Sequence, residues 1–314
     1  MGNMLKKFNV LFLGGAKRIS LGERFINAGK DLNLDVSVFT YDLIKNVPFS
    51  AIGKVIKGKP WNDQNILNHL KFVIKKNNIS IVLANVDKAT IVLAKLNERF
   101  KNLNLISSNS KLCGIFFDKL KMQNEFEKIK LPIIPLSNKI PIFIKPRKGS
   151  ASKNTCIIKN KKNLRYCLSK NSKNKFIMQK YINGIEYTVD AYISKNGCFI
   201  GAVPRIRNKV TDGESTQTTT VKNKKILNLT KKIINNFKFR GPICLQFIET
   251  KNKIYFSEIN TRFGGGVIAS IEAGFNIPQI MIKDFLDYDL KELLNYKKII
   301  MTRFYKETFY EINN

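Results

Sequence analysis

The sequence predicts a mixed α/β and α+β fold, with a parallel-sheet domain first and α+β parts after it. Strand and helix signals alternate through the first third of the 314 residues, which is typical of β-α units packed on a parallel sheet. Further along, two alternating apolar runs joined by a short turn predict a β-hairpin over residues 243–260. We find no internal repeat and no extended linker, so we expect one interlocked protein rather than separable modules.

In the first third, five segments carry the apolar periodicity of strands or helices. They are expected in the order strand 9–13, helix 21–32, strand 35–40, helix 64–75 and strand 80–84. Asp87 is placed to cap a following helix that runs to Leu96. The turn Gly14–Arg18 is rich in glycine but lacks the G-x-G-x-x-G spacing, so it supports no dinucleotide site.

The elements expected in the rest of the chain begin with a helix near Asp118 and a proline-rich connector. The following order is strand 142–145, loop 146–154, strand 176–181, strand 186–194, polar loop 211–220, helix 227–237, the hairpin and terminal helices.

The net charge of +32 raises the question of nucleic-acid binding. Only 10 of the 55 basic residues are arginine, and the lysines are spread along the whole length without a basic tail or stripe. A compositional bias that fills solvated faces with lysine explains this charge at least as well. Nucleic acid is therefore not the expected partner, although such a surface still attracts anionic substrates.

Cysteine usage and hydropathy predict a cytoplasmic protein. The five cysteines are odd in number and form no C-x-x-C pair, as expected of reduced and mostly buried thiols. No apolar segment is long enough to span a membrane, and the first apolar run is too short for a convincing signal peptide. The lone His69 is expected at the surface or its boundary, and the lack of a second histidine argues against a zinc site or a Ser-His-Asp triad.

The most informative stretch is QFIETKNKIYFSEINTRFGGG, which begins at Gln246. Side chains alternate along a strand, so Glu258 and Asn260 share a face that Gln246 can reach, with Arg262 there if the strand continues. One carboxylate, two amides and a guanidinium suit Mg²⁺ carrying phosphates. The glycines that follow free the backbone to approach an anion, and the helix they open presents N–H groups to it. Taken alone, this hairpin is equally consistent with a solvated polar face.

Three polar groups precede the hairpin. Lys145 ends a strand before a loop of small residues, where its ammonium group can meet phosphates. Glu186 follows a strand and a turn, where its carboxylate can meet ribose hydroxyls. Arg205 and Arg207 share a strand face and can grip a carboxylate or phosphate. Taken singly, Lys145 and Glu186 are better explained as an ordinary surface lysine and an ordinary strand residue, and the arginine pair is only modestly informative. The order of these groups along the chain therefore decides.

That order resembles the ATP-grasp superfamily, most closely its single-domain members similar to the ATP-binding halves of the carbamoyl-phosphate synthase large subunit. The resemblance covers nearly the whole chain, and its most specific motifs are GIEYTVD at 184–190 and SEINTRFGGG at 257–266. It implies an ATP-grasp fold with an N-terminal Rossmann-like (pre-ATP-grasp) domain. The implied parts are this domain over 1–112, a small subdomain over 113–184 and a large subdomain with the metal site over 185–314.

The resemblance also implies a role for each candidate residue. ATP would contact Lys119, Lys145 and Ser150 through its phosphates, Glu186 through its ribose, and the backbone of Gln179, Lys180, Tyr181 and Ile182 through its adenine. Mg²⁺, or Mn²⁺ in its place, would be held by Gln246, Glu258 and Asn260. Arg262 and Arg205 would assist catalysis, and the acceptor substrate would face Arg205, Arg207, Gly264 and Gly265.

The implied activity is that of a ligase, which activates a small carboxylate as an acylphosphate and joins it to an amine or similar nucleophile. ADP and phosphate are released. The partners are these small molecules, with no membrane, and a homodimer is left open. Carbamoyl phosphate synthesis by this chain alone is disfavoured because it has one ATP-binding unit, and nothing singles out a biotin carboxylase. The competing classes are a catalytically silent nucleotide sensor and a basic nucleic-acid-binding protein.

Overall fold

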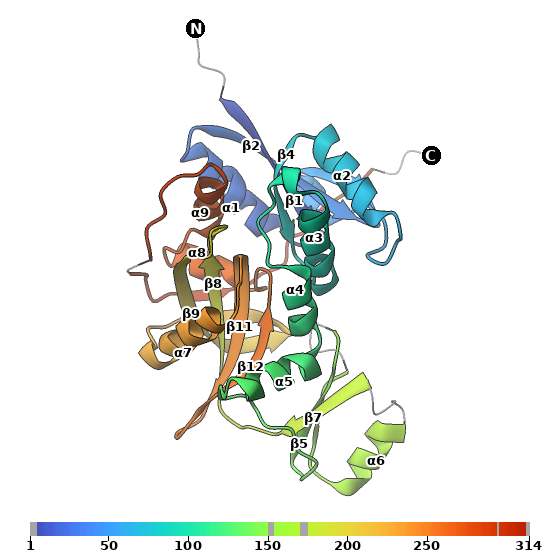
Figure 1. Cartoon of the computed structure of the whole chain (residues 1–314), viewed down its shortest axis with the longest axis vertical. Helices are drawn as coiled ribbons and strands as arrows, with labels where there is room; N and C mark the ends of the chain where they lie inside the picture. The colour runs from blue at the N-terminus through green and yellow to red at the C-terminus, as the bar shows by residue number, and fades with distance from the viewer. Residues whose placement is uncertain (1–4, 150–153, 170–174, 294, 312–314) are drawn as a thin grey trace.

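The computed structural model describes residues 5–149, 154–169, 175–293 and 295–311. Three sheets follow one another along the longest axis (Figure 1). The N-terminal sheet lies at one end, a large antiparallel sheet occupies the middle, and a small sheet lies at the other end. Each sheet takes all its strands from one of the three predicted segments, whose boundaries themselves stay a prediction.

The N-terminal sheet is parallel, as predicted, with the strand order β3-β2-β1-β4. Its strands are β1 (Lys6–Leu13), β2 (Leu34–Asp42), β3 (Lys54–Lys57) and β4 (Ile79–Ala84). The helices of this region are α1 (Ile19–Lys30), α2 (Ile66–Lys76) and α3 (Asp87–Arg99), with short 3₁₀ turns at Pro48–Ala51 and Lys101–Leu103. Because the carboxyl ends of parallel strands share one edge, the segments after β1 and β4 meet there.

The central sheet is antiparallel throughout, in the order β12-β11-β8-β9-β10-β13. Its strands are β8 (Ile185–Ile193), β9 (Phe199–Thr211), β10 (Glu214–Thr220), β11 (Gly241–Glu249), β12 (Ile254–Asn260) and β13 (Ile300–Thr302). The hairpin predicted over residues 243–260 is confirmed as β11 and β12. Helices α7 (Lys224–Asn236), α8 (Val267–Glu272) and α9 (Ile277–Phe285) belong to the same part of the chain.

The small sheet has the order β6-β5-β7, with strands β5 (Ile142–Pro146), β6 (Cys156–Ile158) and β7 (Phe176–Lys180). It carries helix α6 (Lys161–Ser169), and helices α4 (Ser110–Phe117) and α5 (Lys119–Lys128) connect it to the N-terminal part. An isolated bridge between Leu136 and Gln179, and another between Ile133 and Phe256, tie the connector to the small and central sheets.

Two sequence-based predictions need correction. Residues 214–220 were expected in a loop but form β10, because this threonine-rich segment pairs with β9 on one side and β13 on the other. Threonine is β-branched and favours strands, although its polarity gives the segment a loop-like composition. Asp87 does not cap α3; it is the first residue of that helix, and its carboxylate accepts a hydrogen bond from Arg262.

The apolar core is shared between the N-terminal and C-terminal parts of the chain, instead of forming a separate core in each part. One cluster packs β1 and α1 residues such as Phe12 and Phe25 against Phe263, Phe275 and Met281 of the C-terminal part. A second cluster lies between the central sheet and helices α4, α5 and α7, where the rings of Phe126 and Phe256 stack with centroids 4.1 Å apart. The N-terminal sheet is thereby fixed against the central sheet, which positions the edge that carries Arg18.

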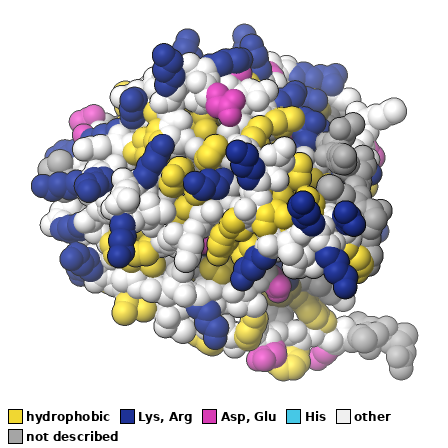
Figure 2. All heavy atoms as spheres, turned by 90° about the horizontal axis from the view of Figure 1, so that it is seen from below, with side chains coloured by type: hydrophobic (Ala, Val, Ile, Leu, Met, Phe, Trp, Pro, Cys, Tyr) yellow, Lys and Arg dark blue, Asp and Glu magenta, His cyan; other side chains and the backbone are white. Residues whose placement is uncertain are grey.

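The surface agrees with the dispersed charge that the composition suggested. Figure 2 shows lysine and arginine side chains scattered over one face, with apolar patches between them and few acidic groups. His69 is half-buried in α2, where the Tyr41 hydroxyl lies 2.8 Å from its Nδ1, as expected of a boundary residue. Within the described ranges, no helix combines the length and apolar character needed to cross a membrane.

Candidate active site

A cleft of about 520 Å³ lies where the three sheets face one another. It is lined from the N-terminal edge by Arg18 and Asn85, from the small sheet by Lys145, and from the central sheet by Gln246 and Glu258. Every predicted site residue within the described ranges lines this cleft; Ser150 lies outside those ranges. Residues separated by more than a hundred positions are therefore brought together in one concave site, which is the usual form of a small-molecule site.

The β11–β12 hairpin provides the acidic end of the cleft. Gln246 lies directly opposite Glu258 across the two strands, and Cys244 lies opposite Asn260. The alternation predicted from the sequence therefore places these polar groups on one face, and Asn260 Nδ2 donates to Glu258 Oε1 over 3.2 Å. Among the described residues, no group of three or more His, Cys, Asp or Glu side chains is arranged to hold a metal. A cation here would take one carboxylate and amide oxygens, which suits Mg²⁺ bound together with phosphates.

Two buried lysines face Glu258. Lys119 Nζ lies 3.8 Å from Glu258 Oε2, and Lys145 Nζ donates to the Ser257 carbonyl over 3.4 Å. Burial lowers the pKa of Lys145 to about 8, with Glu258 opposing and Lys119 reinforcing that shift. Burial would raise the pKa of Glu258, but Lys119, Lys145 and the Asn260 amide together lower it below its ordinary value. The two ammonium groups therefore face a single carboxylate, so these three side chains carry a net positive charge.

An ion pair between Asp118 and Arg147 fixes Lys119 at the N-terminus of helix α5. Asp118 caps that helix by accepting from the backbone N–H groups of Leu120 and Lys121, and Arg147 binds the same carboxylate through two nitrogens, at 3.2 and 2.8 Å. The Lys119 N–H also donates to the Arg147 carbonyl over 2.8 Å. Since Arg147 follows β5, this contact holds Lys119 beside the end of the strand that carries Lys145.

The segment predicted to meet adenine runs along one wall of the cleft. The Lys180 N–H donates to the Pro135 carbonyl, and the Tyr181 N–H donates to the Pro141 carbonyl. The Gln179 side chain is buried and points away from this role, because its amide donates to Gln123 Oε1 and to a backbone carbonyl. The N–H groups of Lys180 and Tyr181 and the Gln179 amide therefore already have internal partners, and the contact of this backbone with adenine stays a prediction.

Glu186 was predicted to meet the ribose and Arg207 the acceptor substrate, yet the two side chains contact each other. Arg207 Nε lies 3.3 Å from Glu186 Oε2, and Arg207 Nη2 donates to the Gly213 carbonyl at the tip of the β9–β10 hairpin. Their strands are neighbours in the sheet, so the predicted ribose carboxylate and the predicted acceptor residue share one wall of the cleft.

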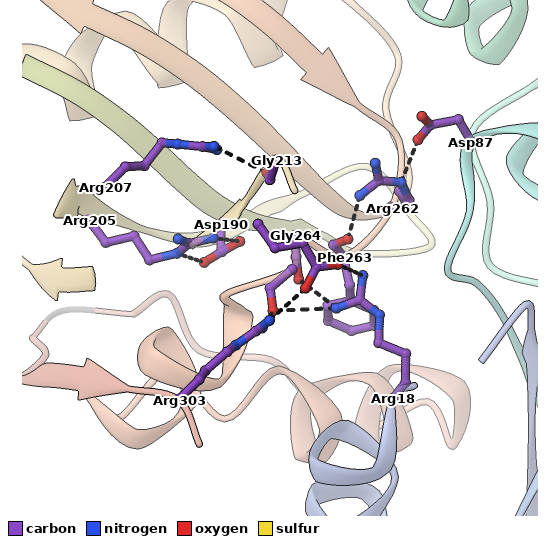
Figure 3. A network of polar contacts seen from close by, with 12 residues as sticks. Arg18, Asp87, Asp190, Arg205, Arg207, Gly213, Arg262, Phe263, Gly264 and Arg303 are labelled. Carbon is purple, nitrogen blue, oxygen red and sulfur yellow. Dashed lines mark hydrogen bonds and ion pairs between the residues drawn. The ribbon is translucent and has the colours of Figure 1, made fainter. Parts of the chain in front are cut away.

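Arg205 is buried, unlike an ordinary arginine of a solvated strand face. Its exposed fraction is 1%, and its guanidinium binds Asp190 through Nε–Oδ2 at 2.7 Å and Nη2–Oδ1 at 3.5 Å (Figure 3). Ser270 also donates to this carboxylate over 2.7 Å. Burial would lower the pKa of Arg205, but the Asp190 carboxylate raises it and keeps the guanidinium charged. Asp190, which ends the GIEYTVD motif, thus anchors Arg205 beneath the cleft.

The glycine turn after β12 packs directly on this ion pair. A Cβ on Gly264 would lie 2.6 Å from Asp190 Oδ1, and one on Gly266 would lie 2.6 Å from Arg205 Nη1. A third glycine, Gly265, passes close to Glu214. The glycine run is therefore required by close approach to a buried salt bridge, a reason that sequence inspection alone did not supply.

We expect Gly264→Ala to lower the free energy of unfolding by about 1–3 kcal/mol, because the new methyl group overlaps the Asp190 carboxylate. Gly114→Ala is the matched control: Gly114 lies within α4, and a Cβ there meets nothing within 4 Å. The control should raise stability by roughly 0.5–1 kcal/mol through helix propensity. Urea unfolding measures both, and equal effects of the two substitutions would contradict the packing argument.

Three further arginines lie at or beside the glycine turn (Figure 3), and of these only Arg262 was predicted from the sequence as a site residue. Arg262 is held by Asp87 at the start of α3, and it also donates to the Phe263 carbonyl over 2.9 Å (Figure 3). Arg18 approaches the glycine turn from the start of α1, and Arg303 approaches it from the end of β13. The glycine-rich turn before Arg18 was the one available signal. Nothing in the local sequence marked Arg303, because its position depends on a three-residue strand pairing.

The three-sheet architecture is the ATP-grasp fold, which solved structures of similar architecture share. Residues 172–307 match the family model described as "ATP-grasp in the biosynthetic pathway with Ter operon". The chain is 26% identical over 230 residues to the carbamoyl phosphate synthase large chain of Clostridium botulinum, which covers 65% of this chain and 21% of that protein. It is 36% identical over 103 residues to the D-alanine–D-alanine ligase of Petrotoga mobilis, covering 30% of this chain and 34% of the ligase.

Among solved structures, N5-carboxyaminoimidazole synthetase from Staphylococcus aureus complexed with ADP superposes with a TM-score of 0.75 at 18% identity. The match covers 97% of this chain and 84% of that one, which establishes a shared fold. The curated relatives are much longer than the matched segments, since the chain spans only 21% and 34% of their lengths.

Proposed function

We propose that this protein is an ATP-dependent ligase that uses Mg²⁺ to activate a small carboxylate and joins it to an amine. The observation that carries the proposal is the convergence of Lys119, Lys145 and Glu258 in one cleft with two amides on the neighbouring strand positions. Two desolvated ammonium groups around one carboxylate leave positive charge that a polyphosphate would neutralise. The names of the matched relatives, a carbamoyl phosphate synthase and a D-alanine–D-alanine ligase, support the same class of reaction.

In this proposal the nucleotide lies along the wall formed by the small and central sheets. The backbone of residues 179–182 meets the adenine, Glu186 meets the ribose, and Lys119 and Lys145 bind the phosphates. Gln246, Glu258 and Asn260 would hold Mg²⁺, which supplies charge neutralisation of the phosphoryl oxygens when bound. Arg262 lines the same cleft as Glu258 and is held by an ion pair with Asp87, so its guanidinium can stabilise the phosphoryl group during transfer.

The proposed chemistry has two steps. A carboxylate oxygen of the first substrate attacks the γ-phosphorus of ATP, and the bond to the bridging oxygen of ADP breaks. The amine nitrogen then attacks the acyl carbon, and the C–O bond to phosphate breaks to release phosphate. The chain's contribution is to place the reactants and to stabilise the negative charge with Lys119, Lys145 and Arg262.

The test is phosphate release from ATP by the purified full chain over pooled carboxylates, amino acids and amines. We expect release with at least one pool, loss of release when EDTA removes the metal, and recovery with Mg²⁺ or Mn²⁺. Nucleotide binding without phosphate release over the whole panel would overturn the ligase and indicate a nucleotide sensor. Tight, steeply salt-dependent binding of DNA or RNA would indicate the nucleic-acid class instead.

A further inference from the structure

Two arginines from opposite ends of the chain converge on one carboxylate beside the glycine turn of the cleft. Arg303 Nη1 donates to Glu214 Oε2 over 2.5 Å, and Arg18 Nη2 lies 4.0 Å from Glu214 Oε1. Both guanidiniums also donate to the Gly265 carbonyl. Figure 3 shows Arg18 and Arg303 approaching the glycine turn from different elements, so that their guanidiniums form a fork of donors at this turn.

Glu214 is a replaceable occupant of this fork. It lies at the tip of the β9–β10 hairpin, just after Gly213, and its side chain is 46% exposed. The Arg18 side chain is only 14% exposed, and two guanidiniums share this single carboxylate. Arginine pairs bind a carboxylate through parallel hydrogen bonds, so a substrate carboxylate could take the position that Glu214 holds in this structure.

Asn85 lines the same cleft and offers a hydrogen-bond acceptor, where the arginines offer donors. Its side chain is 4% exposed and lines the cleft, and its Oδ1 is buried with no hydrogen-bond partner among the described residues. The Asn85 N–H is fixed to the Leu13 carbonyl, at the base of the turn that leads to Arg18. A buried acceptor without a donor is costly, so this oxygen points to a ligand that carries an N–H or O–H group.

We propose that the part of the cleft lined by Arg18, Asn85 and Glu214, with Arg303 behind Glu214, is the subsite for the amine substrate, and that this substrate is an amino acid. Its carboxylate binds the two guanidiniums, and its amino group donates to Asn85 Oδ1. This proposal rests on the proposed ligase function, because it assigns the nucleophile of that reaction.

The step is balanced in atoms and protons. The bound ammonium group loses one proton to solvent to become the free amine, which attacks the acyl carbon of the acylphosphate. As the C–N bond forms, the nitrogen loses a second proton, the C–O bond breaks, and phosphate leaves as hydrogen phosphate. The product is an amide that keeps the carboxylate of the amino acid, so it remains bound by the arginine fork until release.

The experiment measures binding, so it does not depend on turnover. Calorimetry of the full chain with ADP and Mg²⁺ compares each of the twenty common amino acids and D-alanine with the matched amine that lacks the α-carboxylate. We expect at least one amino acid to bind, at least ten times more tightly than its amine. Equal binding of acid and amine, or no binding of any amino acid, would overturn the subsite while leaving ATP-dependent activity with other amines intact.

Substitutions of the arginine fork and of Glu214 test where the amino acid binds. Arg303→Gln should weaken binding of that amino acid at least tenfold, with an intermediate loss in Arg303→Lys, and should leave ADP binding unchanged. Glu214→Gln should strengthen binding because the internal competitor is neutralised. Arg99→Gln, an exposed arginine at the end of α3, is the control and should change neither. If Arg303→Gln binds the amino acid normally while circular dichroism shows a folded protein, the arginine fork is not the site.

Discussion

Glu258→Gln should reduce ATP-dependent phosphate release by roughly 10²–10³-fold or more while the protein stays folded. The substitution keeps the shape of the side chain but removes the single carboxylate that faces Lys119 and Lys145. Any Mg²⁺ bound there loses its charged ligand, and the two lysines lose the charge that balances them. Steady-state phosphate release at saturating ATP measures the effect. Near-normal turnover in this variant would exclude the β11–β12 hairpin as the metal site.

The same carboxylate leaves a signature in the pH dependence of stability. Lys145 has a pKa of about 8 in the folded chain, against an ordinary value of 10.5. Between these values the unfolded chain binds a proton that the folded chain does not, so this residue makes the free energy of unfolding rise with pH. Because Glu258 raises the pKa of Lys145, the rise should begin at a lower pH in Glu258→Gln. Urea unfolding between pH 6.5 and 10 measures it.

Lys145→Met is the control for this pH effect. Methionine fills a similar volume without a charge, so the contribution of Lys145 above pH 8 should vanish from the curve, and catalysis should be lost as well. Replacement of a desolvated charge by an apolar side chain is often neutral or stabilising at pH 7. A Lys145→Met protein with the unaltered pH curve would show that another group causes the rise.

The site was predictable from sequence where a local pattern fixes the geometry. Strand alternation placed Gln246, Glu258 and Asn260 on one face, and the structure has them in register. Period-two alternation is a property of the backbone, so neighbouring residues alone reveal it. The order of the β-α units likewise predicted a parallel N-terminal sheet, which is confirmed.

The rest of the cleft depends on contacts that no local pattern encodes. Arg303 reaches the glycine turn only because β13 joins the edge of a sheet whose other strands lie far earlier in the chain. The carboxylates that hold Arg205 and Arg262 come from Asp190 and Asp87, on separate elements. Single-sequence reasoning could identify arginines as anion-binding groups, but it could not tell which of them already have an internal partner.

Asp190→Ala should lower the free energy of unfolding by about 3–5 kcal/mol, because it leaves the Arg205 guanidinium charged, buried and without its counterion. Ser270 would also lose its acceptor, and the glycine turn would lose the surface on which it packs. Denaturant unfolding monitored by the fluorescence of Trp61, the single tryptophan, measures the loss.

A double substitution, Asp190→Leu with Arg205→Met, separates charge burial from packing. If the cost of Asp190→Ala comes from an uncompensated charge, removing both charges together should recover most of the stability, since apolar groups of similar volume can replace a buried pair. The double variant should still show weakened substrate binding, because the turn at Gly264–Gly266 would no longer be held against a rigid guanidinium. Stability as low as that of Asp190→Ala would instead mean that the hydrogen bonds of this carboxylate, rather than its charge, hold the floor of the cleft in place.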